Sequence, residues 1–175
     1  TQGAAILGSL ALVLLCAYLG YFIHAVIVYS ISAKFGAGLN PLKFFKEAVP
    51  AMIFAFTSAS SAATLPVSKE CAEKMGADKN IAAFVLPLGA TIHMDGTAIY
   101  QCVATVFLAT CAGVDLTLTQ MIMVVAIATL SAIGTAGTPG AGVIMLTMVL
   151  TTLGIPVDYI GLIIAVDRLF DMGRT

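Results

Sequence analysis

The sequence predicts an all-α membrane protein that combines spanning helices with two re-entrant helical hairpins of opposite orientation. Of its 175 residues, 60% are hydrophobic and 10% are charged, and the mean hydropathy is +1.05. A soluble domain usually carries about 45 to 50% apolar and about 25% charged residues. The formal net charge is -1, and no basic run offers a surface for a nucleic-acid backbone. We therefore expect the bilayer to surround most of the chain.

The lengths of the apolar segments justify each element in chain order. A helix needs about 20 residues to cross a hydrocarbon core of about 30 Å. A segment that is shorter, or interrupted by glycine or serine at its centre, predicts a hairpin or a broken helix instead. The predicted elements are a spanning helix (4–33), a first re-entrant hairpin (44–75), a broken spanning helix (81–111), a second re-entrant hairpin (120–153) and the start of a last helix (158–175).

The two ends of the chain predict a fragment of a larger protein. The first residue is Thr1 rather than methionine, and a charged segment typical of a signal peptide does not follow it. Residues 171–175 end inside a helix-compatible pattern that has no cap.

The placement of lysine predicts how these segments are oriented. Cytoplasmic loops next to membrane segments carry an excess of Lys and Arg. The loops around Asp115 and Asp158 contain no basic residue, whereas six lysines flank the first hairpin. The second hairpin is therefore expected to enter from the opposite face, which is typical of an inverted repeat with a site near the midplane. The flanking lysines are Lys34, Lys43, Lys46, Lys69, Lys74 and Lys79.

The centres of both hairpins carry groups that can bind a solute. Ser60 and Ser61 can offer hydroxyl and backbone N–H groups to an anion at the start of a half-helix, which we expect near residues 64–66 with Pro66 in its first turn. A polar turn with self-satisfied serines is the alternative. Residues 134–142 contain four glycines and a proline, so their main chain can closely approach a solute and can move. A plain kinked turn is the alternative there.

A carboxylate in the middle of the predicted broken helix points to a cation. Asp95 lies where an ionised group is costly, which makes a functional role the default interpretation. With carbonyl groups freed near Gly89 and Gly96, it offers the hard oxygen ligands that Na⁺ accepts, by analogy with other hard cations. A structural Asp bonded to backbone N–H groups is the alternative. His93 is only weak evidence for a transition metal.

The last predicted helix presents several polar groups on one face. Asp167, Asp171, Arg174 and Thr175 recur at helical spacing. Arg174 can bind a carboxylate through two hydrogen bonds, and Asp171 can bind an ammonium group one turn away. The pattern therefore fits an amino acid with an acidic side chain. Pairing of Asp171 with Arg174, or a helix end already in cytoplasmic water, is the alternative.

Four segments of the chain resemble the signatures of the glutamate transporter family, the dicarboxylate/amino acid:cation symporters. They cover nearly the whole chain in the family's order, and they are residues 60–66 (SSAATLP), 93–97 (HMDGT), 134–142 (GTAGTPGAG) and 171–175 (DMGRT). The resemblance implies that residues 1–175 are part of a mobile transport domain containing two hairpins, a broken seventh helix and the start of the eighth. It also implies an elevator motion against a homotrimeric scaffold whose helices lie outside this chain, with the second hairpin as the outer gate.

The resemblance also assigns roles by position. It implies that Arg174 holds the side-chain carboxylate of the substrate and that Asp171 holds the amino group, with Na⁺ as the coupling ion. The implied substrate contacts are Ser60, Ser61, Thr97, Thr138, Gly142, Asp171, Arg174 and Thr175. The implied sodium ligands, several of them through main-chain carbonyls, are Gly89, Thr91, His93, Met94, Asp95, Ala132, Ile133 and Thr135.

The chain departs from the family pattern at three places. The family usually has Asn at the position of His93, some members have Arg at that of Ala59, and others have Arg at that of Met172. Because an imidazole titrates near neutrality, His93 is expected to weaken the sodium dependence or to add pH sensitivity. The chain also ends before an Asn and an Asp that complete the family's sites.

The function expected from these residues is transport and not enzymatic catalysis. We expect symport of aspartate or glutamate with Na⁺ in a multi-pass protein of the cell membrane, the inner membrane in a bacterium, with lipid and a small-molecule substrate as partners and no nucleic acid. A proton-coupled carrier of dicarboxylates or neutral amino acids is one alternative. An intramembrane aspartyl protease that uses Asp95 and Asp171, or a channel, is a more distant one.

Overall fold

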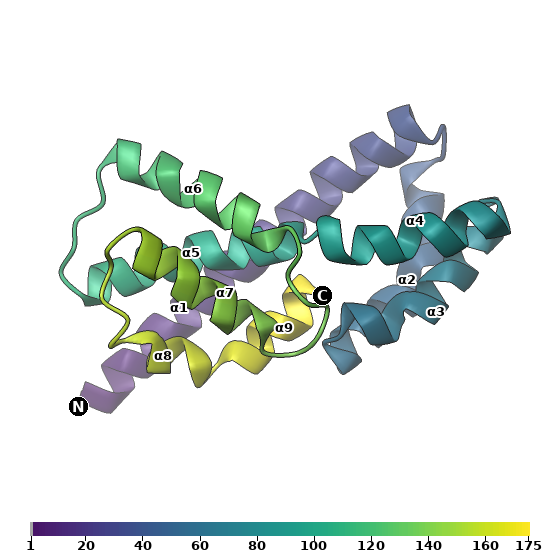
Figure 1. The fold of residues 1–175 in the computed structure, drawn as a ribbon. Helices are drawn as coiled ribbons and strands as arrows, with labels where there is room; N and C mark the ends of the chain where they lie inside the picture. Colours follow the sequence, from purple (N-terminus) through teal and green to yellow (C-terminus); the bar gives the residue numbers. More distant parts are fainter. Residues whose placement is uncertain (1) are drawn as a thin grey trace.

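The helices of this protein are joined by short turns (Figure 1). The structure is a computed structural model that describes residues 2–175, and the side chains of residues 6–175. The described residues form no strand, which confirms the predicted all-helical class. The elements are α1 (Gln2–His24), the π-helices η1 (Ala25–Tyr29) and η2 (Ser32–Gly36), α2 (Pro41–Ser58), α3 (Ser61–Lys74), α4 (Lys79–Ile92), α5 (Asp95–Cys111), α6 (Leu118–Ala132), α7 (Ala141–Thr152), α8 (Ile160–Ile164) and α9 (Asp167–Arg174).

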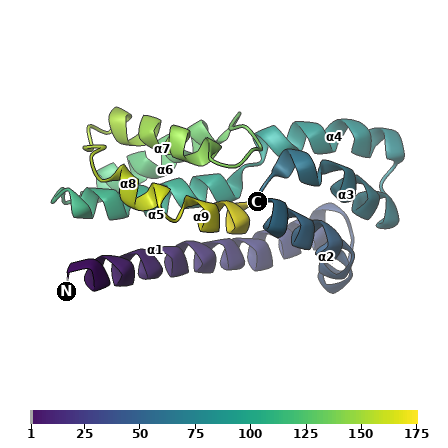
Figure 2. The ribbon, with the colours of Figure 1, turned by 90° about the horizontal axis from the view of Figure 1, so that it is seen from below.

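The helices gather in two groups along the molecule. At one end α2 packs against α3 and α3 against α4, and at the other α5 packs against α6, α7 and α9 (Figure 1). Figure 2 shows α1 running along one side of the second group, where it contacts α5 and α9. The turns between α2 and α3, α4 and α5, and α6 and α7 lie between the two groups, close to the end of α9. Segments distant in sequence therefore meet at the centre.

In the part of the chain that the structure describes, two helical segments are long and apolar enough to cross a membrane, judged by length and composition. They are Ile6–Gly36 and Lys79–Cys111, and little of either is buried inside the molecule. The helices α6 and α7 are apolar but shorter. Outward-facing apolar side chains on helices of this length are typical of contact with lipid or with further helices.

The first segment is not one regular α-helix. The sequence predicts a spanning helix over residues 4–33, but the α-helix ends at His24 and continues as two π-helical turns to Gly36. An almost uninterrupted apolar run contains no periodic signal that distinguishes these two geometries.

The helix that follows Ser60 begins earlier than predicted. It starts at Ser61, so Pro66 lies inside α3 and the expectation that it occupies the first turn is wrong. Ser60 determines this start because its hydroxyl accepts a hydrogen bond from the Ala63 N–H at 3.2 Å, as an N-cap does.

The predicted last helix consists of two short ones. The α-helical hydrogen bonding of α8 ends at Ile164, and α9 begins at Asp167 after a non-helical Val166. This change of direction points Asp167 into the interior, where it accepts a hydrogen bond from the Tyr100 hydroxyl at 3.1 Å. The buried rings of Tyr100 and Phe170 pack at 5.1 Å between centroids and fix α9 against α5.

Candidate functional site

The tips of the two predicted hairpins are in direct contact. The Gly137 carbonyl accepts hydrogen bonds from the Ser60 hydroxyl at 2.9 Å and from the Ala62 N–H at 3.1 Å. A Cβ on Gly137 would lie 3.1 Å from both Ala62 N and Ser61 Cβ, closer than most real contacts of this kind. The absence of a side chain at Gly137 therefore allows one tip to dock on the other.

The loop between α6 and α7 is also bonded to α4 and to α9. The Gly134 N–H donates to the Thr91 carbonyl at 2.8 Å, and the Gly140 N–H donates to Asp171 Oδ2 at 2.8 Å. Gly140 has a φ of 82°, a left-handed conformation that glycine adopts without strain. The loop between α6 and α7 is thus anchored on three separate segments.

Arg174 and Asp171 form a buried ion pair at the end of the chain's last helix. The Arg174 side chain is 6% exposed and that of Asp171 is 2% exposed. The Arg174 guanidinium also lies over the Tyr100 ring, 5.0 Å from its centroid. Its Nη1 atom is buried without a hydrogen-bond partner among the described residues. Because an unsatisfied buried donor is costly, the guanidinium retains the capacity to bind an acceptor such as a carboxylate.

A small cavity of about 20 Å³ lies between the two tips and Arg174. One water molecule needs about 10–15 Å³ measured in the same way, so this cavity does not hold an amino acid as the tips now stand. Five of the eight predicted substrate residues line it, namely Ser61, Thr97, Thr138, Arg174 and Thr175.

The remaining predicted substrate residues contact this group without lining the cavity. Asp171 pairs with Arg174, and Ser60 bonds the Gly137 carbonyl. Gly142 lies against the Arg174 guanidinium so closely that a Cβ there would overlap it. The structure therefore brings the predicted substrate residues together.

The predicted sodium ligands divide into two sets. Met94 and Thr135 line the cavity, and the Ala132 carbonyl accepts from the Thr135 N–H at 3.1 Å. The side chains of Thr91, His93 and Ile133 are exposed, and the Gly89 carbonyl accepts from the His93 N–H at 2.8 Å. Asp95 does not line this cavity and faces α1. The donors are mainly oxygens, and in the described part of the chain no three His, Cys, Asp or Glu residues come together as a transition-metal site requires.

Two residues near the site were missed by reasoning from the sequence. His24 of α1 lies 3.3 Å from Asp95, measured from Nε2 to Oδ2. It could have been found, because an ionisable residue within an apolar spanning segment indicates a functional position. Tyr100, which supports both Arg174 and Asp167, has no spacing or charge that marks it in the sequence.

The two carboxylates of the protease alternative have separate partners. Asp95 contacts His24, whereas Asp171 pairs with Arg174 and accepts from Gly140. Two catalytic aspartates that share a proton must face each other, and these do not form such an arrangement.

Known proteins place the chain in one family. The model of the sodium:dicarboxylate symporter family matches residues 1–175. Excitatory amino acid transporter 1 of Rattus norvegicus is 44% identical over 169 residues, which are 96% of this chain and 31% of that protein. A putative sodium-dependent excitatory amino acid transporter, glt-4 of Caenorhabditis elegans, is 43% identical over 158 residues, 90% of this chain and 32% of the relative.

A relative with a different substrate name matches almost as well. Neutral amino acid transporter B(0) of Mus musculus is 41% identical over 168 residues, 95% of this chain and 30% of that protein. The chain spans just under a third of the length of these relatives. The whole-chain family match confirms the resemblance read from the four motifs, and the chain belongs to the sodium:dicarboxylate symporter family.

Proposed function

We propose that the protein containing this chain is a secondary active transporter that couples movement of an acidic amino acid, aspartate or glutamate, to Na⁺. One observation carries the proposal: a buried guanidinium and a buried carboxylate, Arg174 and Asp171, lie together where two helical tips meet. These charges match the side-chain carboxylate and the ammonium group of such a substrate. Relatives named excitatory amino acid transporters support the same substrate class.

In this proposal, substrate binding replaces the ion pair between Arg174 and Asp171 with two ion pairs to the substrate. The substrate's side-chain carboxylate takes Arg174, and its ammonium group takes Asp171, so neither buried charge is left unpaired. The other carboxylate binds at the tip where Ser60 and Ser61 precede α3, because a helix start offers free N–H groups. The hydroxyls of Thr97, Thr138 and Thr175 and the main chain at Gly142 complete the proposed contacts.

The oxygen donors around the proposed broken helix are of the chemical type that binds Na⁺. Asp95 supplies a carboxylate, and the neighbouring segments supply hydroxyl and carbonyl oxygens of the kind that hard cations prefer. Bound Na⁺ would supply positive charge beside these oxygens and favour the helix ends in their present arrangement. The residues proposed to hold it are Gly89, Thr91, His93, Met94, Asp95, Ala132, Ile133 and Thr135.

Entry of a substrate requires the loop between α6 and α7 to move. The cavity of about 20 Å³ is far smaller than an amino acid. The hydrogen bonds that hold the loop run from Ser60 and Ala62 to Gly137, from Gly134 to Thr91, and from Gly140 to Asp171. We therefore assign the gate to this loop.

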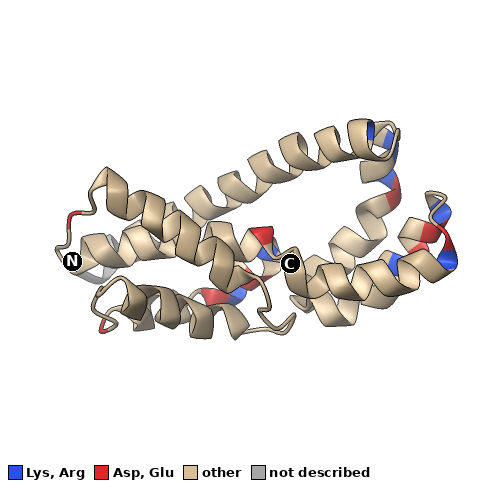
Figure 3. Ribbon diagram, turned by 45° about the horizontal axis from the view of Figure 1, so that its top comes forward, with Lys and Arg blue, Asp and Glu red and all other residues tan. Residues whose placement is uncertain are grey.

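The proposed architecture is part of a transport domain, with residues 44–75 and 120–153 as re-entrant hairpins and 81–111 as the broken seventh helix. Figure 3 supports its orientation, because the lysines gather at the end formed by η2, α2, α3 and α4. The turns between α5 and α6 and between α7 and α8, which contain Asp115 and Asp158, lie at the other end (Figure 1). The protein is proposed to lie in lipid as a multi-pass protein of the cell membrane, as a homotrimer that moves this domain like an elevator.

Thermal melting of the full-length protein tests the proposal. With Na⁺ present, aspartate or glutamate at about 100 times its Kd should stabilise the fold by about 2.7 kcal/mol, and without Na⁺ the stabilisation should disappear. Stabilisation by a dicarboxylate or by a neutral amino acid alone would contradict the substrate assignment. A shift that is equal in Na⁺ and in choline would contradict sodium coupling.

A further inference from the structure

His24 and Asp95 approach each other across the interface between α1 and α5. His24 is the last residue of α1, and Asp95 is the first residue of α5. Their Nε2 and Oδ2 atoms are 3.3 Å apart. The His24 side chain is 23% exposed, and the Asp95 side chain is 43% exposed. The imidazole of α1 therefore lies beside Asp95, the acidic side chain at the start of α5.

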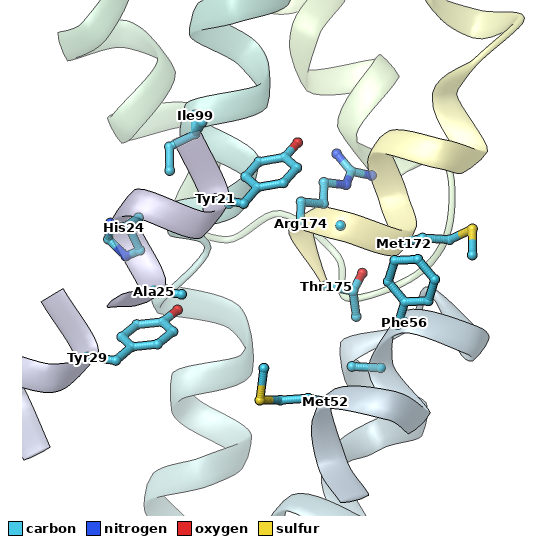
Figure 4. Close-up of a pocket in the computed structure, with 13 residues that line it drawn as sticks. Tyr21, His24, Ala25, Tyr29, Met52, Phe56, Ile99, Met172, Arg174 and Thr175 are labelled. Atoms are coloured by element: carbon cyan, nitrogen blue, oxygen red, sulfur yellow. The ribbon is translucent and has the colours of Figure 1, made fainter. Parts of the chain in front are cut away.

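His24 Nε2 has no other polar contact in the described part of the chain. The atom is buried and forms no hydrogen bond, and its 3.3 Å approach to Asp95 falls short of hydrogen-bond geometry. A buried imidazole N–H without a partner is costly. Asp95 Oδ2, at 3.3 Å, is an acceptor within reach of this nitrogen. Figure 4 shows His24 beside a cavity of about 220 Å³ that Arg174 also lines.

The change from α-helix to π-helix after His24 explains how the ring is held. Tyr29 lies five residues further on, and the two rings pack edge to face with centroids 5.3 Å apart and planes at 82°. In an α-helix, residues five apart point about 140° away from each other, since each residue turns the chain by about 100°. A π-helix bonds residue i to residue i+5 and brings them onto one face. The π-helical turn therefore places Tyr29 against His24.

We infer that His24 is a positioning residue for Asp95. In this role the imidazole N–H holds one carboxylate oxygen from α1 and leaves the other directed at the cation. The inference rests on the proposed function, because it takes Asp95 as a sodium ligand. Ligating carboxylates are commonly oriented by hydrogen bonds from a neighbouring group, and loss of such a group typically weakens metal affinity by about 10–100-fold.

The experiment measures the NaCl concentration that gives half of the maximal aspartate-induced rise in melting temperature of the full-length protein. Choline chloride keeps the ionic strength constant. His24→Phe keeps the ring and removes the donor, and it should raise this concentration about tenfold while leaving the aspartate affinity at saturating NaCl unchanged. His24→Gln can place its amide nitrogen near the position of Nε2 and should restore the wild-type value. Tyr29→Phe keeps the ring contact and serves as the matched control.

Two results would overturn the inference. One is an unchanged NaCl requirement in His24→Phe, and the other is equal damage in His24→Phe and His24→Gln, which would indicate a role in packing alone. If His24→Phe does not fold, His24→Asn replaces it, because its shorter amide does not reach the position of Nε2. An unchanged NaCl requirement in that variant would equally overturn the inference.

A variant of Asp95 separates this inference from the proposed function. If Asp95 is a sodium ligand, Asp95→Asn should raise the NaCl concentration that gives half of the maximal aspartate-induced rise in melting temperature, or abolish the dependence on NaCl. If it does so while His24→Phe does not, only the role of His24 fails. If Asp95→Asn leaves the NaCl dependence unchanged, the sodium assignment fails and the role of His24 fails with it.

Discussion

Arg174 occupies a position that glycines make possible. A Cβ on Gly96 would lie 2.5 Å from the Arg174 carbonyl oxygen, and one on Gly142 would overlap the guanidinium. A Cβ on Gly173 would lie 2.9 Å from the rings of Tyr18 and Tyr21 on α1. Helices α5, α7 and α1 can therefore approach α9 closely only because these positions lack side chains.

Replacing Arg174 should separate acidic from neutral substrates. In Arg174→Ala we expect at least a hundredfold loss of aspartate affinity, since a hydrogen-bonded charge pair contributes several kcal/mol when one partner is removed. Some affinity for neutral amino acids should remain, because Asp171 can still bind an ammonium group. Isothermal titration of the full-length variant with aspartate and with alanine measures both.

The control for this change keeps the charge. Arg174→Lys retains a cation beside Asp171 but cannot bind a carboxylate through two parallel hydrogen bonds. It should fold as the wild type does and should bind aspartate with intermediate affinity. Undiminished aspartate affinity in Arg174→Ala would rule out the assigned role of this residue.

Adding one methyl group at Gly142 should disturb the same site. Gly142→Ala forces the guanidinium to move, because the new Cβ would occupy its volume. We expect aspartate affinity to fall at least tenfold, a change of about 1.4 kcal/mol. Gly161→Ala is the control, since no atom lies within 4 Å of a Cβ at that helical position. Equal aspartate affinities in the two variants would show that the close contact has no bearing on binding.

At the scale of the helices, Ser60 links the start of α3 to the loop between α6 and α7. It caps α3 through the Ala63 N–H and donates to the Gly137 carbonyl. Ser60→Ala should lower the free energy of unfolding by about 1 kcal/mol through the lost cap. It should also raise hydrogen–deuterium exchange in residues 134–140, because one of the bonds that hold the loop is lost.

Ser68→Ala provides the comparison for this variant. Ser68 lies on the same helix two turns beyond the cap, so its replacement should change neither the unfolding free energy nor exchange in the loop. Unaltered exchange of residues 134–140 in Ser60→Ala would show that the loop does not depend on this bond.

The sequence predicts that the chain is helical, but it does not predict where a helix becomes π-helical or is interrupted. Apolar runs of sufficient length identify α-helical segments, and capping residues such as Ser60 help to define their starts. The hydrophobic pattern of the sequence contains no signal for the π-helical turns after His24 or for the break at Val166. The π-helical turn brings His24 and Tyr29 together within one local segment, and the break at Val166 accompanies a long-range hydrogen bond from Tyr100 to Asp167, and neither contact follows from regular helical spacing.

The candidate site was predictable where a motif or an unusual charge marks it. Arg174 and Asp171 are charges in an apolar chain, and the structure places them as a buried pair. Their pairing with each other was foreseen only as an alternative, because helical spacing fixes which residues are neighbours and not which neighbour each one bonds. Tyr100 was not predictable, since nothing in the sequence distinguishes a supporting ring from an ordinary core aromatic.

At the scale of the whole molecule, the charges at the two ends predict opposite sides of the membrane. Lys74→Cys lies at the lysine-rich end, and Asp115→Cys lies in the turn between α5 and α6 at the other. In intact cells that produce full-length protein with its native cysteines replaced, an impermeant maleimide should label the Asp115→Cys variant and spare the Lys74→Cys variant.

Permeabilised cells supply the control for this labelling. Both variants should then react, which shows that each cysteine is accessible. Labelling of both in intact cells, or of the Lys74→Cys variant alone, would contradict the proposed orientation.

The two donors that converge on the Gly137 carbonyl have a consequence for the behaviour of the proposed gate. Because Ser60 and Ala62 share one acceptor atom, a displacement of Gly137 weakens both bonds together. The loop is also held by separate bonds from Gly134 to Thr91 and from Gly140 to Asp171. Full opening therefore requires the loop to leave three anchoring segments, and loss of the two bonds at Gly137 frees it from the first of them alone.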